Sequence, residues 1–413
     1  MKYLSQHDLL DSSSESQPLA GMSNGINGHR DIRWFSQMSI ENGGNKRDKP
    51  QLRGSVPRVL PAVSEISDGR QARVSVTKLD LFWLIISVLT YLADFGSDIW
   101  VALLHKKNKD TWWMALTISF ILAPFFVMNI VLCFMKICRR RLFYFIVSIP
   151  GGLIFLFIRD IISGCKAFRN QGYIGKHIDN LSESLFLRLL ESFVEAAPQL
   201  VLQLYVMLNT PQKTVAPIQL ITVSLSLVSL SWAVVAFYKT FRLSSDTETY
   251  KVNIPGMISC FCWHFFTIGA RVLAYAICAI YNEFALLGVA VGHVVILILF
   301  YSCLHHSQGH VKNFCTFIFH DALFNWFILL FCSQSLFFDL SKTRLHYIFI
   351  HTLTFLENIV MLLLWCFSTW STIAPLWLIP CVFPAIIAGY LIGILFQILY
   401  YVKFHPKKLY ISR

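Results

Sequence analysis

Long apolar segments separated by short polar connections dominate the chain from about residue 80 to residue 403. Eight of the ten segments approach or exceed the roughly 20 residues that an α-helix needs to cross the hydrocarbon core of a membrane. The pattern therefore predicts an all-α polytopic membrane protein. The ten segments are Leu81–Leu104, Trp113–Met135, Leu142–Ile158, Leu185–Leu208, Ile218–Tyr238, Met257–Tyr281, Phe284–Leu304, Phe314–Leu330, Tyr347–Phe367 and Leu376–Val402.

Two of these segments, Leu142–Ile158 and Phe314–Leu330, are shorter than the others. Pro150 and the two glycines after it interrupt the first one, and a proline removes a backbone donor from the middle of a helix. Basic residues lie on both sides of this segment, and positively charged loops favour the cytosol. The second segment has a weaker version of the same pattern. We therefore expect eight transmembrane helices plus two re-entrant helical hairpins, with both termini in the cytosol.

The order of the segments indicates an internal repeat. They divide into two sets of five with the short hairpin third in each set, as in many membrane transport folds. We expect two pseudo-symmetric halves, about 79–250 and 251–403, within one transmembrane domain, 79–403. Residues 1–78 are rich in Ser, Gly, Asn and Arg without a sustained apolar period, which predicts a disordered cytosolic tail. Residues 404–413 form a short cytosolic C-terminal tail.

Composition and charge support the membrane interpretation. Hydrophobic residues make up 55% of the 413 residues and charged residues only 14%, whereas soluble domains carry about 25% charged residues. The net charge of +12 comes from Lys and Arg that flank apolar segments, which is typical of orientation signals and contacts with anionic lipids rather than of nucleic-acid binding. The chain has no phosphate-binding glycine loop, G-x-S-x-G or H-E-x-x-H motif. We expect no enzymatic activity, no cofactor and no metal site.

Charged and polar side chains recur inside several predicted spans. Asp94 and Asp98 are four residues apart and share one face of the first helix. A polar stripe that ends at Gln203 runs along the fourth predicted helix at spacings of three and four. One charge facing lipid at a helix centre costs about 2.5–3.5 kcal/mol, so these side chains must face one another or water. The residues assigned to this polar track are Asp94, Asp98, Arg188, Glu191, Glu195, Gln199, Arg271 and Glu357.

The charges allow two interpretations. In the structural one, Arg188 and Arg271 pair with carboxylates and fasten the helices together. In the functional one, the side chains line a track for a charged group. Five acids cannot all pair one to one with two bases, and this surplus of negative sites favours the functional interpretation.

Four tracts of the chain resemble the XK-related family of phospholipid scramblases. The resemblance extends from about residue 80 to residue 406 and does not include residues 1–78. It implies eight spans and two membrane-embedded hairpins in two pseudo-symmetric halves. The tracts are Y-L-A-D-F-G-S-D-I-W (91–100), L-R-L-L-E-S-F-V-E-A-A-P-Q-L-V-L (187–202), K-V-N-I-P…C-W-H-F-F-T-I-G-A-R-V (251–272) and F-H-P (404–406).

The resemblance also implies an activity, which is exposure of phosphatidylserine at the plasma membrane without ATP or calcium. It implies that Asp94, Asp98, Glu191, Glu195 and Arg271 form a stepped path for the lipid headgroup. The expected partners are therefore phospholipids, especially phosphatidylserine. A single-span chaperone subunit and a lipid-transfer protein are further candidates.

Apoptotic members of this family are activated when a caspase removes a terminal segment. Two positions in the N-terminal tail fit such a site, because each has an acid three residues before an aspartate and a small residue after it. They are Asp68, in E-I-S-D followed by Gly69, and Asp11, in D-L-L-D followed by Ser12. We favour Asp68, because cleavage there would free nearly the whole tail.

Three functions follow from these observations. The first is a scramblase of the apoptotic branch that a caspase activates. The second is a constitutive XK-like membrane partner of a lipid-transfer protein. The third is an ion- or proton-coupled transporter that uses the acidic stripe.

Overall fold

The computed structural model describes residues 76–134, 149–209, 217–245, 252–307, 328–332, 343–370 and 379–404. These residues contain helices and no strand, which confirms the all-helical prediction. The longer helices are α2 (Lys78–Lys107), α3 (Thr111–Phe134), α5 (Leu153–Arg169), α6 (Ile174–Val194), α7 (Ala196–Asn209), α8 (Pro217–Ser245), α9 (Ile254–Tyr281), α10 (Glu283–Ser307), α13 (Thr343–Trp370) and α14 (Ile379–Leu399).

Seven helices in the described ranges are long and apolar enough to cross a membrane, namely α2, α3, α8, α9, α10, α13 and α14. The chain is therefore a multi-pass membrane protein. The total of eight spans and two re-entrant hairpins stays a prediction. Residues 142–148 of the first predicted hairpin and 314–327 of the second lie outside the described residues, as do the tail positions Asp11 and Asp68.

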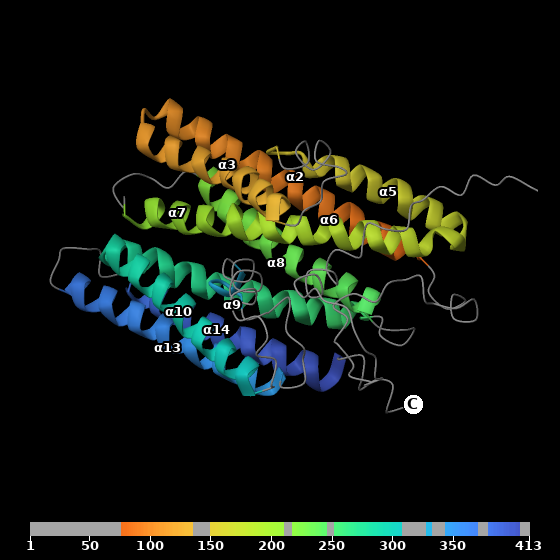
Figure 1. The fold of residues 1–413 in the computed structure, drawn as a ribbon. Helices are drawn as coiled ribbons and strands as arrows, with labels where there is room; N and C mark the ends of the chain where they lie inside the picture. The colour runs from red at the N-terminus through yellow and green to blue at the C-terminus, as the bar shows by residue number, and fades with distance from the viewer. Residues whose placement is uncertain are drawn as a thin grey trace, which may run out of the picture.

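The helices form one elongated bundle (Figure 1). α2, α3, α5 and α6 lie on one side of it and α10, α13 and α14 on the other, with α7, α8 and α9 between them. α8 packs against α2 and α6, whereas α9 packs against α7, α8, α13 and α14. Of the seven candidate spans, α9 has the largest buried share, 72%. The set of helices that contains α2, α3, α5 and α6 and the set that contains α10, α13 and α14 thus meet near α9.

The predicted fourth segment, Leu185–Leu208, is covered by two helices, α6 and α7, that are interrupted at one residue. α6 ends at Val194 and α7 begins at Ala196, with Glu195 between them. Pro198 accounts for the break, because it has no N–H to donate to the carbonyl of Val194 and its ring would clash with that group. The polar stripe therefore crosses a helix break in the middle of the bundle.

The helix of the third segment continues beyond Ile158, where the predicted apolar segment ends. The chain turns at 149–152, where Gly151 adopts a φ of 83°. α5 then begins at Leu153 and continues to Arg169. The apolar run ends at Arg159, but Arg159 donates to Glu183 Oε2 at 2.8 Å, so its charge is paired and the helix can continue.

α14 approaches α9 closely at Gly393. A Cβ atom at this position would lie 2.6 Å from Thr267 Cγ2, 3.0 Å from Thr267 N and 3.1 Å from Trp263 O. Two of these atoms belong to the backbone and cannot move aside. We expect Gly393→Ala to destabilise the protein by about 1–3 kcal/mol, measured as a lower thermal unfolding midpoint in detergent. Gly389→Ala is the matched control, because its nearest atoms are 3.9 and 4.0 Å away. Equal midpoints for the two variants would contradict this close approach.

Candidate functional site: two buried polar networks

The first network joins α2, α6 and α8 around Arg188. Arg188 Nη1 donates to Glu191 Oε2 at 2.9 Å. Arg188 Nη2 lies 3.4 Å from Asp94 Oδ2 and also donates to Ser229 Oγ. The guanidinium carbon lies 4.7 Å from the centre of the Tyr91 ring, and the Tyr91 hydroxyl donates to Glu191 Oε1 at 3.5 Å. Arg188 is 5% exposed, so these protein groups replace water around its charge.

The same network continues along α7. Gln203 Nε2 donates to Asp98 Oδ1 at 3.2 Å, which joins α7 to α2. Glu195 lies at the helix break, between α6 and α7. Several buried atoms here have no hydrogen-bond partner among the described residues, namely Asp94 Oδ1, Glu195 Oε1, both amide atoms of Gln199 and Gln203 Oε1.

The acids of this network outnumber its base. Arg188 forms ion pairs with Asp94 and Glu191, whereas no ion pair among the described residues includes Asp98 or Glu195. These two carboxyl groups are only 1% and 6% exposed. Burying a charge without a partner is costly, so both need a cation or a proton. The first network can therefore bind a positively charged group.

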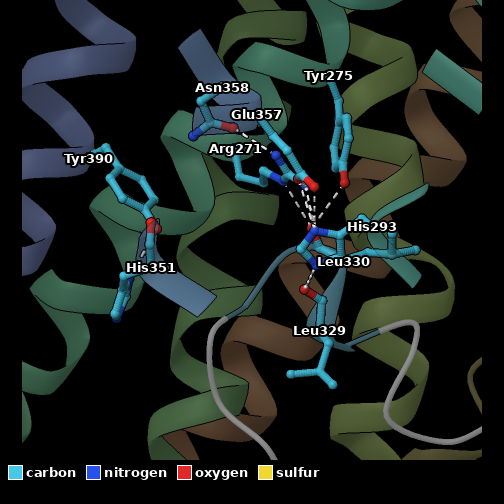
Figure 2. A network of polar contacts seen from close by, with 9 residues as sticks. All are labelled: Arg271, Tyr275, His293, Leu329, Leu330, His351, Glu357, Asn358 and Tyr390. Carbon is cyan, nitrogen blue, oxygen red and sulfur yellow. Dashed lines mark hydrogen bonds and ion pairs between the residues drawn. The ribbon is translucent and has the colours of Figure 1, made fainter. Parts of the chain in front are cut away.

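The second network joins α9, α10 and α13 around Arg271 (Figure 2). Arg271 forms an ion pair with Glu357 and donates from Nη1 to Asn358 Oδ1 at 2.9 Å. Glu357 Oε2 also lies 2.9 Å from His293 Nδ1. Arg271 is fully buried, so the Glu357 carboxylate balances its charge inside the bundle, and Asn358 and His293 provide further polar contacts.

Comparison with known proteins places this fold in a family. The model of the XK-related protein family matches residues 82–406. The chain belongs to the XK-related family. The match covers nearly the same range as the four tracts, and it confirms the family predicted from them.

Three relatives are similar to this XK-related chain over most of their length. XK-related protein 8 of Gasterosteus aculeatus is 25% identical over 359 residues, which cover 80% of this chain and 84% of the relative. Cell death abnormality protein 8 of Caenorhabditis briggsae is 24% identical over 394 residues, covering 84% and 82%. XK-related protein 8 of Tetraodon nigroviridis is 24% identical over 361 residues, covering 79% and 84%.

The XK-related fold separates the predicted track into two groups. Asp94, Asp98, Arg188, Glu191, Glu195 and Gln199 all lie in the first network, whereas Arg271 and Glu357 pair with each other in the second. No ion pair within the described residues joins the two groups. Both arginines are paired with carboxylates, as the structural interpretation expects. The acids that exceed the number of bases lie in the first network.

Besides Tyr275, which lies one helical turn after Arg271 on α9, four residues that contribute to the networks were not predicted, namely Tyr91, Ser229, His293 and Asn358. Tyr91 precedes Asp94 by three residues, and helical spacing places both on one face. Asn358 directly follows Glu357, and His293 lies alone in an apolar segment. Those three had a signal in the sequence. Ser229 is one of several serines in α8, and nothing in the sequence distinguishes it.

In the part of the chain that the structure describes, no group of three or more His, Cys, Asp or Glu residues could hold a metal ion.

Proposed function

We propose that this XK-related protein is a phospholipid scramblase that exposes phosphatidylserine at the cell surface. The observation that carries the proposal is a pair of buried acids, Asp98 and Glu195, that form no ion pair with any described residue and lie beside the helix break in the first network. Two relatives support an assignment to the apoptotic branch of the family, since one is named XK-related protein 8 and another cell death abnormality protein 8. We place the protein in the plasma membrane with both termini in the cytosol.

The mechanism follows from the chemistry of the headgroup. The acyl chains stay in hydrocarbon while the headgroup passes along the polar face of α6 and α7. Its ammonium group pairs with Asp98 and Glu195, whose buried carboxyl groups need a cation or a proton. Its phosphate binds Arg188 when it replaces one of the carboxylates with which that arginine is paired. Each contact replaces part of the water that the headgroup loses.

The helix break contributes to this path. Interrupted helices in membrane proteins line binding sites, because the backbone groups freed at the break offer polar contacts at membrane depth. Pro198 leaves the carbonyl of Val194 without its usual helical donor. We infer that this carbonyl and the Gln199 amide bind the headgroup between Glu195 and Asp98. Neither the oxygen nor the nitrogen of that amide has a hydrogen-bond partner in the part of the chain that the structure describes.

Purified protein reconstituted in liposomes tests the proposal. A fluorescent lipid in both leaflets, treated with a quencher that cannot cross the membrane, should lose nearly all its fluorescence when the protein scrambles lipid. Protein-free vesicles should keep the inner-leaflet share. The experiment needs no ATP and no ion gradient, so a positive result also excludes a coupled transporter as the explanation. Protection of the inner leaflet in vesicles that contain the folded protein cleaved after Asp68 would contradict the proposal.

We further propose that a caspase activates the protein by cleavage after Asp68. A chain that begins at Gly69 should expose phosphatidylserine without an apoptotic stimulus, because the tail is gone. In dying cells, Asp68→Ala should block exposure, whereas Asp11→Ala serves as the control and should leave it intact. Annexin binding to intact cells measures both. If the truncated chain reaches the cell surface but exposes no phosphatidylserine, activation by cleavage after Asp68 is contradicted. A stable lipid-transfer protein in pull-downs, with no effect of Asp68→Ala, would favour a constitutive partner instead.

A further inference from the structure

A short turn, Ile328–Cys332, lies where the two sets of helices meet. Ile328 and Cys332 belong to the buried apolar cluster that contains Phe193 of α6. Phe331 packs against this cluster and also against the cluster of α9, α13 and α14. Its ring centre lies 6.4 Å from that of Phe193 and 5.4 Å from that of Tyr275. Phe331 thus connects α6 with α9.

Side chains of the second network bind the backbone of this turn (Figure 2). Arg271 Nε and the Tyr275 hydroxyl donate to the carbonyl of Leu330 at 3.1 and 3.2 Å. His293 Nε2 lies 3.1 Å from the carbonyl of Leu329. A buried carbonyl in a membrane protein requires such a partner, because no lipid can supply one. We call Arg271, Tyr275 and His293 the carbonyl clamp.

Glu357 holds the clamp together. It forms an ion pair with Arg271, and both of its carboxyl oxygens lie within 3.1 Å of His293 Nδ1. His293 therefore bridges α13 and the turn through its two ring nitrogens. The turn is bound by residues of α9 and α10, and these are fixed by α13. Its position is determined by the second network.

We propose that the carbonyl clamp and Phe331 form a latch that keeps the first network closed. Phe193 lies between Glu191 and Glu195 in the sequence, so a contact that fixes Phe193 also fixes the helix break. In the present arrangement both arginines are paired, and the four acids of the first network are at most 6% exposed. Releasing the latch removes a packing contact between the two sets of helices. Without this contact, the conformation in which a ligand can reach the acids of the first network becomes more populated.

His293→Leu tests the clamp, because leucine fills a similar space without a hydrogen bond. In the purified full chain in lipid nanodiscs, this variant should accelerate alkylation of Cys332 by N-ethylmaleimide about tenfold or more, measured by mass spectrometry. That fold-change corresponds to the loss of hydrogen bonds to charged and buried groups. His351→Leu is the matched control, because His351 bonds to Tyr390 and does not touch the turn. Equal alkylation in both folded variants would overturn the clamp.

Hydrogen exchange tests whether the latch reaches α6. His293→Leu and Phe331→Ala should each accelerate amide exchange in a peptide that spans residues 191–199 by about tenfold. The double variant should exchange no faster than the faster single variant, because both changes break one connection. His351→Leu should match the wild type. Exchange rates that multiply in the double variant, or that do not change, would overturn the latch.

The effect on lipid exposure rests on the proposed scramblase function. Both single variants should raise scrambling by the uncleaved chain at least about threefold, again without a further gain in the double variant. Lower scrambling in folded variants would overturn the proposed direction. If even the chain cleaved after Asp68 does not scramble, the proposed function fails. Alkylation and exchange would still decide whether the latch exists.

Discussion

Glu195→Gln is expected to lower the rate of phosphatidylserine exposure at least about tenfold while the protein still reaches the cell surface. Glu195 is buried at the helix break and forms no ion pair among the described residues. Glutamine keeps the size of the side chain but cannot carry the charge that attracts an ammonium group. A charge-assisted hydrogen bond contributes about 1.5–3 kcal/mol, and each 1.4 kcal/mol corresponds to a factor of ten. Annexin binding and surface biotinylation measure the two quantities.

Glu183→Gln is the matched control, since Glu183 lies on the same helix, α6, but pairs with Arg159 outside the first network. It should leave exposure within about twofold of the wild type. Asp98→Asn should behave like Glu195→Gln. If Glu195→Gln instead prevents surface expression, the acid is structural and the path through it is wrong. Unchanged exposure by a well-expressed variant would also contradict the path.

Arg188→Ala is expected to destabilise the protein by about 3–5 kcal/mol, because it leaves Asp94 and Glu191 buried without their cation. This loss is a large fraction of the roughly 5–15 kcal/mol that stabilises a folded domain. The thermal unfolding midpoint in detergent and the yield of monodisperse protein measure it. Lys239→Ala breaks the partly exposed pair with Asp80. It should cost less than about 1 kcal/mol.

A compensated variant separates charge pairing from packing. Arg188→Met combined with Asp94→Asn and Glu191→Gln removes the whole set of paired charges and keeps similar volumes. Buried ion pairs can often be replaced by neutral groups with little loss, so this variant should recover most of the stability that Arg188→Ala loses. Equal instability of the two variants would show that the network is not held by its charge balance.

The sequence by itself determined the class of protein, most of its helices and its family. Hydrophobic length is a local property, so the predicted ranges for α2, α9 and α10 lie within a few residues of the observed ones. The surplus of acids was also visible, because a charge inside an apolar segment needs no structure to be noticed. Pro198 carried the signal for the break in α6–α7, but helical spacing on both sides of it suggested one continuous stripe.

The tertiary structure decided which charges meet. Helical spacing shows that Glu191 and Glu195 share a face, but only packing shows that Arg188 pairs with Asp94 and that Arg271 pairs with Glu357. The partners are far apart along the chain, and their contact depends on how each helix is rotated about its axis. The turn that connects the two networks illustrates this best. Its carbonyls have no sequence signature, and their partners follow only from the assembled bundle.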